Sequence, residues 1–485
     1  MHKTITFFFL LSGLAFASQA PKLPVNLLIA PTLPQDAFAY TPKNLSLDKP
    51  LLTKTEQEKF RKLFLQHYYY PWSEKNVPTQ FSITADGKHS KPVMYYENAI
   101  INAYELKPGY GQTYHPNSKV FIKSIVANMQ LNTFPDVNCR HSDMCHGIAV
   151  KNTNIRELPT TKPSYNEITG PGEAYPFDNF QDSNLWLGTP VQVVQQSKDK
   201  KWFLIKGPGL LGWVKANTIA FTSKNFIQQW QQHSLLTPIL RQTVIDHNLQ
   251  MHFPIKIYIG SFLPEVKKNA YDYITLLPLM GPKHQAVTAA YHVSNDLVTQ
   301  WPLTPTPRHF NRIINQFLGM SYGWGGLGFD TDCSGTMRRL FGVFGIWLPR
   351  NSKSQLEYSG KMFALTKKNY SETQRRTLLM HNAKSEIPRL IPYLTLIGFG
   401  GENDKIGHVT LYLGQYPIKN PKDLILFQSV WGVHIMQGKT NVGRAIIGKA
   451  VISKMGFGSN LNLLNTGYTT QGLWQEPGIY VTNIN

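Results

Sequence analysis

Cys333 lies at the end of a glycine-rich stretch, residues 322–335, that reads YGWGGLGFDTDCSG. We expect the glycines before it to adopt positive φ angles, which cost glycine little, at Gly323, Gly325, Gly326 and Gly328. After Cys333, apolar residues recur at the period of a helix: Met337, Leu340, Phe341 and Phe344. The pattern predicts a helix that begins next to Cys333, where the helix dipole favours the nucleophilic thiolate over the thiol. A lone cysteine at a helix start is more often a small buried hydrophobic residue, so the rest of the chain decides between the two interpretations.

A cysteine nucleophile needs a base beside the thiol and a polar group that orients the base. His408 begins an alternating segment, GHVTLYLG, which predicts a strand whose polar face carries His408, Thr410 and Tyr412. Gln428 lies in the next apolar run, LILFQSVWG, and its amide oxygen can accept a hydrogen bond from an imidazole N–H. His434 is the alternative for this third position.

The chain has three cysteines. Cys139 and Cys145 can close a small disulfide loop in an oxidising compartment, which leaves Cys333 as the odd thiol. The alternative is a metal site made of Cys139, His141, Cys145 and His146, but this spacing matches no common zinc pattern. We therefore expect a disulfide rather than a metal, and no cofactor.

The composition indicates a multidomain globular protein with an anionic partner. At 485 residues the chain predicts two to four domains, and 42% hydrophobic residues exclude a disordered chain. The formal charge of +20 favours contact with nucleic acid, a membrane surface or an acidic polymer. The basic residues are spread along the chain without a cluster, so nucleic-acid binding is not expected; a basic protein with no single target is the alternative.

Residues 1–17 have the pattern of a secretory signal peptide. Lys3 precedes an apolar stretch over residues 5–14, and Ala15 and Ala17 fit the small-residue cleavage rule. The apolar stretch is too short to span a bilayer, and no other run in the sequence reaches that length. We expect export to the periplasm or secretion, with no transmembrane segment after the signal is removed; a retained anchor is the alternative.

The elements upstream of Cys333 predict three further units. Residues 18–135 are expected to form an N-terminal domain of mixed structure. Thr53 and Thr55 each precede a glutamate by three positions, a capping-box pattern that predicts a helix start. We expect this helix to stop at Pro71 and Trp72, because proline removes a backbone donor. The tyrosines at 68–70 are expected to pack in a core rather than to bind a sugar ring.

Two units of short β-type runs follow. Residues 136–222 predict a small barrel, because short strands alternate with turn residues. A second unit of this kind spans 223–303. The runs of the first unit lie at 155–160, 189–194, 202–205 and 212–214, and those of the second at 255–259, 273–277 and 287–292.

The last predicted domain spans 304–485 and begins with a helix. Thr306 suits the N-cap, Pro307 the first helical position and Gly319 the position after the end. Apolar residues at helical spacing fill the segment: Phe310, Ile313, Ile314, Phe317 and Leu318. Strands are predicted at 394–399, 408–413 and 424–428, and the basic stretch 361–390 is expected to be a solvated insertion. A helix with Cys333 ahead of a strand with His408 indicates an α+β fold.

The motifs of this last domain resemble those of the NlpC/P60 cysteine peptidases. They are YGWGG, DCSG, LPRNSKSQ over residues 348–355, GHVTLYLG and QSVWG, in this order. The resemblance covers about 304–440 and implies a papain-like fold. The upstream units are similar to those of multidomain members, with an N-terminal domain and two bacterial SH3-like β-barrels. FDNFQDSNLWLGTPV over residues 177–191, followed by GWV, is the basis for the barrels.

By this resemblance, Cys333 is the nucleophile, His408 the base and Gln428 the third polar residue of the site. The positions that line the substrate cleft of such enzymes are Tyr322, Trp324, Asp332, Ser334, Arg350 and Ser352. Many relatives have histidine at the third position. Gln428 can make the same hydrogen bond as that histidine but cannot carry its charge. Structural roles are the alternative for three of the cleft positions: a core residue for Trp324, a helix cap for Asp332 and the support of the turn at 348–349 for Arg350.

The resemblance implies an exported cysteine endopeptidase that hydrolyses peptidoglycan stem peptides through a thioester acyl-enzyme. The implied bond lies between γ-D-glutamate and diaminopimelate, and the implied partners are peptidoglycan or muropeptides. Two alternatives stay open at the level of the sequence. One is a non-catalytic protein that binds the cell wall, and the other is an exported effector that uses the same thiol for amidase or acyltransferase chemistry.

Overall fold

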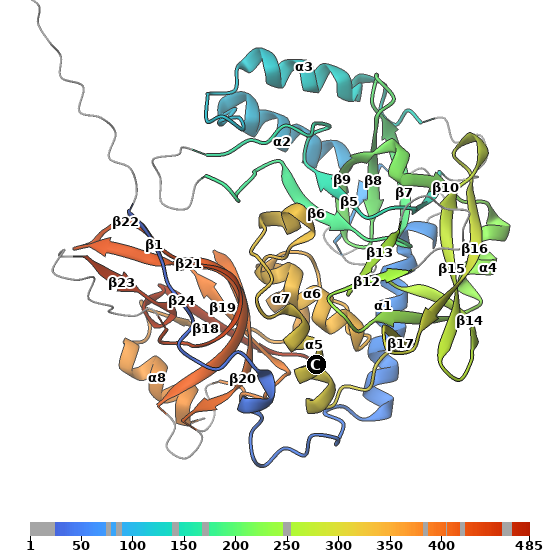
Figure 1. Cartoon of the computed structure of the whole chain (residues 1–485). Coiled ribbons are helices and arrows are strands. Elements are labelled where there is room, and N and C mark those ends of the chain that lie inside the picture. Colours follow the sequence, from blue (N-terminus) through green and yellow to red (C-terminus); the bar gives the residue numbers. More distant parts are fainter. Residues whose placement is uncertain are drawn as a thin grey trace, which may run out of the picture.

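The structure is a computed structural model of the whole chain (Figure 1). The described residues are 25–73, 79–83, 90–137, 145–166, 174–245, 254–381, 387–403, 405–417, 422–457 and 468–485. The predicted signal peptide, residues 1–17, and Cys139 of the predicted disulfide lie outside the described residues, as does His141 of the alternative metal site.

The C-terminal part is built on an eight-stranded sheet in the order β1-β22-β21-β20-β19-β24-β18, with β23 paired to β21. Neighbouring strands are antiparallel, except that β1 and β22 are parallel. The strands are β1 (Val25–Leu28), β18 (Phe363–Thr366), β19 (Thr395–Gly400), β20 (Ile406–Tyr416), β21 (Asp423–Gln437), β22 (Thr440–Lys454), β23 (Thr469–Gln471) and β24 (Gly478–Asn483). The three predicted strands are confirmed within β19, β20 and β21, which are all longer than expected.

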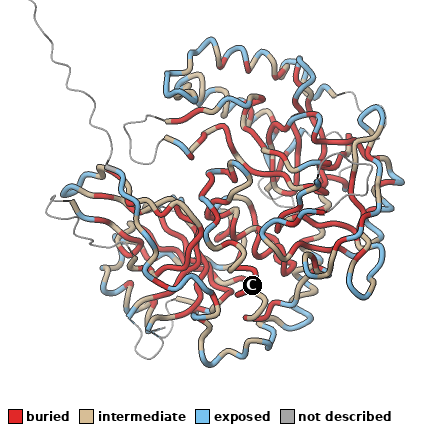
Figure 2. The backbone as a smooth tube through the Cα atoms, in the orientation of Figure 1, coloured by how far each residue is buried: buried red, intermediate tan, exposed pale blue. Residues whose placement is uncertain are grey.

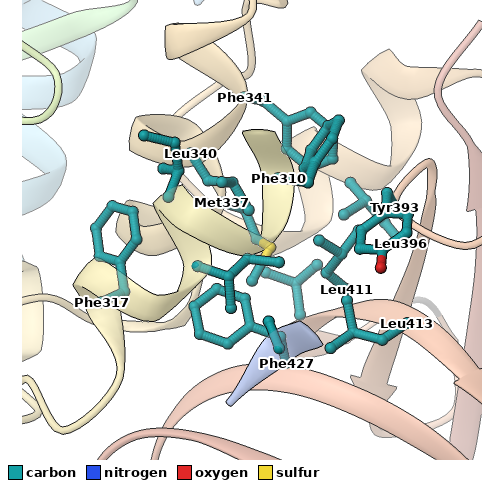
Figure 3. Packing of buried hydrophobic residues seen from close by; sticks show 14 of the residues in the cluster. Phe310, Phe317, Met337, Leu340, Phe341, Tyr393, Leu396, Leu411, Leu413 and Phe427 are labelled. Carbon is teal, nitrogen blue, oxygen red and sulfur yellow. The ribbon is translucent and has the colours of Figure 1, made fainter. Parts of the chain in front are cut away.

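Three helices cover one face of this sheet: α5 (Pro307–Phe317), α6 (Cys333–Val343) and α7 (Ser352–Ser359). The helix caps follow the sequence, because the Thr306 hydroxyl accepts from the His309 N–H and Gly319 has a φ of 77°. The side chains between helices and sheet form a continuous core, shown in Figure 3, in which Phe310 stacks on Phe344 at 4.0 Å between ring centroids. This core fixes the helix that carries Cys333 against the strands that carry His408 and Gln428.

The opposite face of the sheet is also buried, which corrects the expectation of a solvated insertion. Helix α8 (Glu372–His381) and the short helix η6 (Leu473–Gln475) cover this face, so the stretch 361–390 is not simply a solvated insertion. Arg375 on α8 is fully buried and donates to the carbonyl oxygens of Glu476 and Trp474 at 2.8 and 3.0 Å. The predicted polar face of β20 is therefore not solvated: Thr410 and Tyr412 are buried. Figure 2 shows the central strands of this sheet as mostly buried.

Two further sheets lie upstream. The first has the order β10-β4-β7-β8-β9-β5-β6, and the second β16-β15-β14-β11-β17. The strands of the first are β4 (His146–Ala149), β5 (Thr153–Arg156), β6 (Gln181–Leu185), β7 (Pro190–Gln196), β8 (Trp202–Gly207), β9 (Leu210–Lys215) and β10 (Ile219–Phe221). Those of the second are β11 (Ser234–Pro238), β14 (Leu263–Lys268), β15 (Asp272–Met280), β16 (Ala286–Ser294) and β17 (Val298–Trp301). A hairpin of β12 (Gln242–Ile245) and β13 (Ile255–Tyr258) and helix α4 (Lys224–Gln231) accompany the second sheet.

Helix α1 (Lys54–Ser73) lies at the junction of these parts (Figure 1). The capping box at Thr53 is confirmed, because its hydroxyl accepts from the Glu56 N–H while Glu56 accepts from the Thr53 N–H at 2.7 Å. The helix ends at Ser73, one residue beyond the predicted stop at Pro71 and Trp72. Pro71 lies in the last turn, where it removes one hydrogen bond, and the buried Trp72 beyond it donates to the Gly147 oxygen at 2.8 Å. Tyr68 is buried, as the core interpretation requires.

Two helices of the N-terminal part were not expected from the sequence. They are α2 (Val93–Leu106) and α3 (Lys119–Met129), which pack on the outside of the first upstream sheet, while β2 (Gln80–Phe81) and β3 (Lys91–Pro92) form a short hairpin. The first described residues of the chain lie elsewhere: β1 extends the C-terminal sheet, and Gln35 exchanges two hydrogen bonds of 2.9 Å with the backbone of Ile452. The N-terminal segment is thus part of the C-terminal core.

None of the described helices combines the length and the apolar character that a transmembrane span requires.

Candidate active site

Cys333 is the first residue of α6, as the sequence predicts. Asp332 is the N-cap of this helix, and its carboxylate accepts from the Gly335 N–H at 2.7 Å. The Cys333 thiol is free and nearly buried, with its Sγ atom 3.5 Å from the Ser352 hydroxyl at the start of α7. The sulfur therefore lies at the N-termini of two helices, where partial positive charge stabilises a thiolate.

His408, on β20, joins Cys333 to a chain of polar side chains. Its Nε2 atom is 2.7 Å from the Gln428 Oε1 atom, and its ring also hydrogen-bonds the Cys333 thiol. The Gln428 amide nitrogen in turn donates to the Ser453 hydroxyl at 2.7 Å. That bond leaves the Gln428 oxygen to accept the Nε2 proton, so Nδ1 faces the sulfur. The structure places Gln428 at the third position, whereas His434 lies farther along β21, opposite Arg444.

The thiol and the imidazole shift each other's pKa. Burial alone would raise the pKa of the Cys333 thiol, but the hydrogen bond and charge of His408 outweigh it and lower this pKa from its usual value. Burial alone would lower the pKa of His408, and the bonds to Cys333 and Gln428 raise it instead. Both shifts favour a thiolate–imidazolium pair, which is the reactive form of a cysteine nucleophile.

Gln428→Ala is expected to lower kcat by about 10- to 150-fold, because a hydrogen bond to a charged group contributes about 1.5–3 kcal/mol. Without the Gln428 oxygen, the His408 ring loses the acceptor that fixes its tautomer and orientation. The measurement is kcat on a peptide that the wild type cleaves. Ser453→Ala is the matched control, because it removes only the hydroxyl that accepts a hydrogen bond from Gln428. Its kcat should therefore fall by less. Equal rates for Gln428→Ala and wild type would exclude the orienting role.

Asp332 and Arg350 form a buried ion pair behind the nucleophile. The Arg350 guanidinium contacts both carboxylate oxygens of Asp332 and also donates to the Ser334 hydroxyl at 2.9 Å. Side-chain exposure is 14% for Arg350 and 8% for Asp332, so the pair is shielded from water. The structure thus shows Asp332 as a helix cap, and it shows Arg350 bound to the residues around Cys333 rather than to the turn at 348–349.

The rest of the LPRNSKSQ motif fixes the first turn of α6. The Gln355 amide nitrogen donates to the Ser334 and Pro349 carbonyl oxygens, each at 2.8 Å. Ser352 supplies the hydroxyl beside the thiol, and Asn351 caps α7 by accepting from the Ser354 N–H. The Cys333 segment is therefore contacted directly by three polar residues of the motif: Arg350, Ser352 and Gln355.

The glycine-rich loop before α6 is held by strand β6 of the first upstream sheet. Gln181 and Asn184 donate through their side-chain amides to the Gly325 and Gly326 oxygens at 3.0 and 2.7 Å. Gly325 and Gly326 have φ angles of 60° and 76°, and a Cβ on Gly326 would collide with the Asn184 amide. Positive φ is also confirmed at Gly328, but Gly323 is extended, with a φ of −129°.

A second contact crosses the same junction. The Arg350 Nε atom donates to the Ser183 hydroxyl of β6 at 2.8 Å. The upstream sheet therefore touches both the loop before Cys333 and the arginine that binds its helix cap.

An open cleft of about 280 Å³ lies beside His408. Aromatic rings from two domains form one wall, with Phe177 of the upstream part lying 5.8 Å from Tyr322 and 5.6 Å from Trp324 between ring centroids. Tyr322 is nearly buried, whereas Trp324 is 42% exposed and so is not a core residue. Trp431 completes this wall at 6.1 Å from Tyr322.

Sequence reasoning missed several residues of this cleft. Phe177 and Trp431 lie inside the quoted motifs but had no assigned role, and Arg444 and Glu476 lie beyond the last motif. For Arg444 and Glu476, the one available signal was their polarity within otherwise apolar runs. That signal is too weak to distinguish them from the other charged residues of the chain. Ser334 and Ser352, which were predicted for the cleft, lie at the base of the nucleophile.

A free thiol at a helix start, an imidazole on a facing strand and an amide that orients it define a papain-like cysteine peptidase. Family models agree with this class: NLPC_P60 stabilising domain, N term, matches residues 4–134, the SH3 domain (SH3b1 type) matches 163–215, and the NlpC/P60 family matches 319–436. The solved structure of an NlpC/P60 endopeptidase from Photobacterium damselae subsp. piscicida is 36% identical in sequence, with a TM-score of 0.88. The similarity covers 95% of this chain and 99% of that one.

The chain therefore belongs to the NlpC/P60 family, and it is a cysteine peptidase. This confirms the resemblance and the α+β class, with an SH3-like domain and an N-terminal stabilising domain upstream. A second SH3-like barrel at 223–303 and the exact domain boundaries stay predictions.

One curated relative is more distant. The gamma-D-glutamyl-L-lysine dipeptidyl-peptidase of Bacillus cereus (strain ATCC 10987 / NRS 248) is 26% identical over 191 residues, which are 36% of this chain and 54% of that protein. The chain thus spans about half the length of the curated relative that it matches.

Proposed function

We propose that this protein hydrolyses the stem peptides of peptidoglycan, at the bond between γ-D-glutamate and diaminopimelate. The observation that carries the proposal is the Cys333–His408–Gln428 set, of which His408 and Gln428 line an open cleft. The Bacillus cereus relative supports the γ-D-glutamyl side of the bond, because it is a gamma-D-glutamyl-L-lysine dipeptidyl-peptidase. The net charge of +20 suits an anionic wall polymer.

The proposed reaction has two halves. The Cys333 thiolate attacks the carbonyl carbon of the γ-D-glutamyl amide, and the negative charge moves to the carbonyl oxygen at the positive end of α6. The His408 imidazolium gives its proton to the leaving amine, the C–N bond breaks, and a thioester to Cys333 forms. His408, now neutral, takes a proton from a water molecule that attacks the thioester. The carboxylic acid leaves and the thiolate–imidazolium pair is restored.

The other residues around Cys333 have supporting roles in this proposal. Tyr322, Trp324 and Trp431 supply flat apolar surface against which the peptide lies, and Phe177 extends it from the upstream domain. Asp332, Ser334, Arg350 and Ser352 fix the helix start that carries the thiol. In this arrangement their effect on the rate comes from positioning Cys333.

The experiment that tests the function is mass spectrometry of defined muropeptides after incubation with the protein. Release of L-Ala-γ-D-Glu together with a diaminopimelate-containing fragment is the expected result. Cleavage at another bond would support the peptidase activity but contradict the proposed bond. No cleavage of muropeptides, with acyl transfer or deamidation of another substrate instead, would favour the effector alternative.

Export is part of the same proposal, because the substrate lies outside the cytoplasm. The signal pattern at residues 1–17 is the basis for it. The mass of the protein recovered from its own cells tests this point: removal of the first 17 residues is expected, and an intact N-terminus in the cytoplasm would reject it.

A further inference from the structure

Beyond His408, the floor of the cleft is a row of polar side chains on three neighbouring strands. Gln471 of β23 lies opposite His434 of β21, and His434 lies opposite Arg444 of β22. Residues directly opposite each other in a sheet point to the same face, so the three side chains are neighbours. All three line the cleft that contains His408.

Glu476 stands beside this row, just after η6. Its backbone oxygen accepts from Arg375 at 2.8 Å, and the preceding Gln475 oxygen accepts from the Gln471 side chain at 2.6 Å. These bonds fix the backbone that presents Glu476. Burial raises the pKa of its carboxyl, while the charges of His408 and Arg444 act in the opposite direction, so the carboxylate lies within electrostatic reach of both.

The cleft therefore carries one charge of each sign near His408. Among the described residues that line it, Arg444 is the one lysine or arginine, and Glu476 is the one aspartate or glutamate. The charge of His434 does not add to these at neutral pH, because burial and the neighbouring Arg444 lower its pKa to about 4.

The chemistry of cleavage decides which half of the substrate meets these charges. His408 protonates the leaving amine, so the amino acid on the amine side of the scissile bond lies against His408. The cleft beside His408 is lined by Glu476 and Arg444, so these are the charged groups available to the side chain of that amino acid. In diaminopimelate, this side chain ends in an ammonium and a carboxylate on the same carbon, whereas lysine ends in an ammonium alone.

We propose that Arg444 and Glu476 form a binding site for the zwitterionic far end of diaminopimelate, with Arg444 on the carboxylate and Glu476 on the ammonium. The inference rests on the proposed function and adds the residues that select the diamino acid. Arginine binds carboxylates through two parallel hydrogen bonds, which gives both affinity and geometry. A lysine substrate has no far-end carboxylate for Arg444 to bind, and a site built for a polar group discriminates strongly against an analogue that lacks it.

The test is a set of four peptides, L-Ala-γ-D-Glu-X, in which X carries both far-end groups, one of them or neither. The residues X are meso-diaminopimelate, 2-aminopimelate with the carboxylate only, lysine with the ammonium only, and norleucine with neither. The measurement is kcat/KM of the wild type, Arg444→Gln and Glu476→Gln on each peptide. Arg312→Gln is the control, since it removes the same charge from an exposed position of α5.

Arg444→Gln is expected to lose about 10- to 100-fold in kcat/KM on diaminopimelate and aminopimelate, and less than about threefold on lysine and norleucine. For Glu476→Gln, kcat/KM is expected to fall more on the diaminopimelate and lysine peptides than on the aminopimelate and norleucine peptides. A loss on all four peptides alike in Arg444→Gln would overturn the proposal, because Arg444 would then act on the shared glutamate carboxylate or on the fold. If the wild type cleaves none of the four while Cys333 still reacts with iodoacetamide, the proposed function fails instead.

Discussion

Cys333→Ala is expected to lower kcat on a γ-D-glutamyl peptide by at least about 10⁴-fold, because no other group in the site can form the thioester. The thiol is held between the Ser352 hydroxyl and the His408 ring, and it is the free cysteine of the described chain. Product formation followed by mass spectrometry over hours measures the residual rate.

The loss should come from chemistry and not from folding. Alanine removes only the sulfur atom from a nearly buried position, and the Asp332 cap and the core residues of α6 remain. The unfolding temperature of Cys333→Ala should therefore stay within a few degrees of the wild type, and the variant should still sediment with peptidoglycan.

The wild-type thiol offers an independent check of the same site. Alkylation by iodoacetamide should proceed at pH values below the ordinary pKa of a cysteine, because His408 lowers the pKa of Cys333. In His408→Ala, the alkylation rate at neutral pH should fall towards that of an ordinary buried thiol. Turnover by Cys333→Ala at more than a few per cent of the wild-type rate would remove this residue from the mechanism.

The positions of the candidate site residues in the fold could be predicted from the sequence, because each one lies in a segment with a strong local signal. The Cys333 helix has a regular apolar period and a capping aspartate, and the His408 strand has a clean alternation. These local patterns survive in the fold, because the apolar faces of α6 and β20 both enter one core. Gln428 could be chosen because it lies in the next predicted strand. The antiparallel pairing of β20 with β21 brings it close to His408.

The contacts that depend on distant segments could not be predicted in this way. Strand β6 holds the glycine-rich loop through Gln181 and Asn184, which lie more than a hundred positions upstream and have no helical or strand period that points to the loop. Likewise, the alternation of β20 predicted a polar face, and the packing of α8 and η6 that buries this face could not be read from it. Arg444 enters the cleft through the register of β22 against β21, which a single sequence does not specify.

Arg350→Met is expected to destabilise the Cys333 segment by about 3–5 kcal/mol, the usual effect of removing one partner of a buried ion pair. The Asp332 carboxylate would stay buried without its counter-charge, and the Ser183 and Ser334 hydroxyls would lose their common donor. The Gly325 and Gly335 N–H groups would still donate to Asp332, so the helix cap itself is not removed.

Arg308→Met is the matched control for this change. Arg308 forms an ion pair with Asp48 in which the side chains are 35% and 69% exposed, and such surface pairs contribute little to stability. Because a chain of several domains does not unfold in one step, hydrogen exchange of the peptide covering residues 322–335 is the suitable measurement. Exchange there should be much faster in Arg350→Met and unchanged in Arg308→Met.

A second variant separates the lost charge pair from lost packing. In Arg350→Met with Asp332→Asn, the orphaned carboxylate is neutral, so protection of residues 322–335 should recover in part. Recovery means that the uncompensated charge of Asp332 causes the destabilisation. If the double variant exchanges as fast as Arg350→Met, the guanidinium acts by filling space between β6 and α6. If Arg350→Met exchanges no faster than Arg308→Met, the ion pair does not fix the nucleophile, and the positioning role proposed for it is wrong.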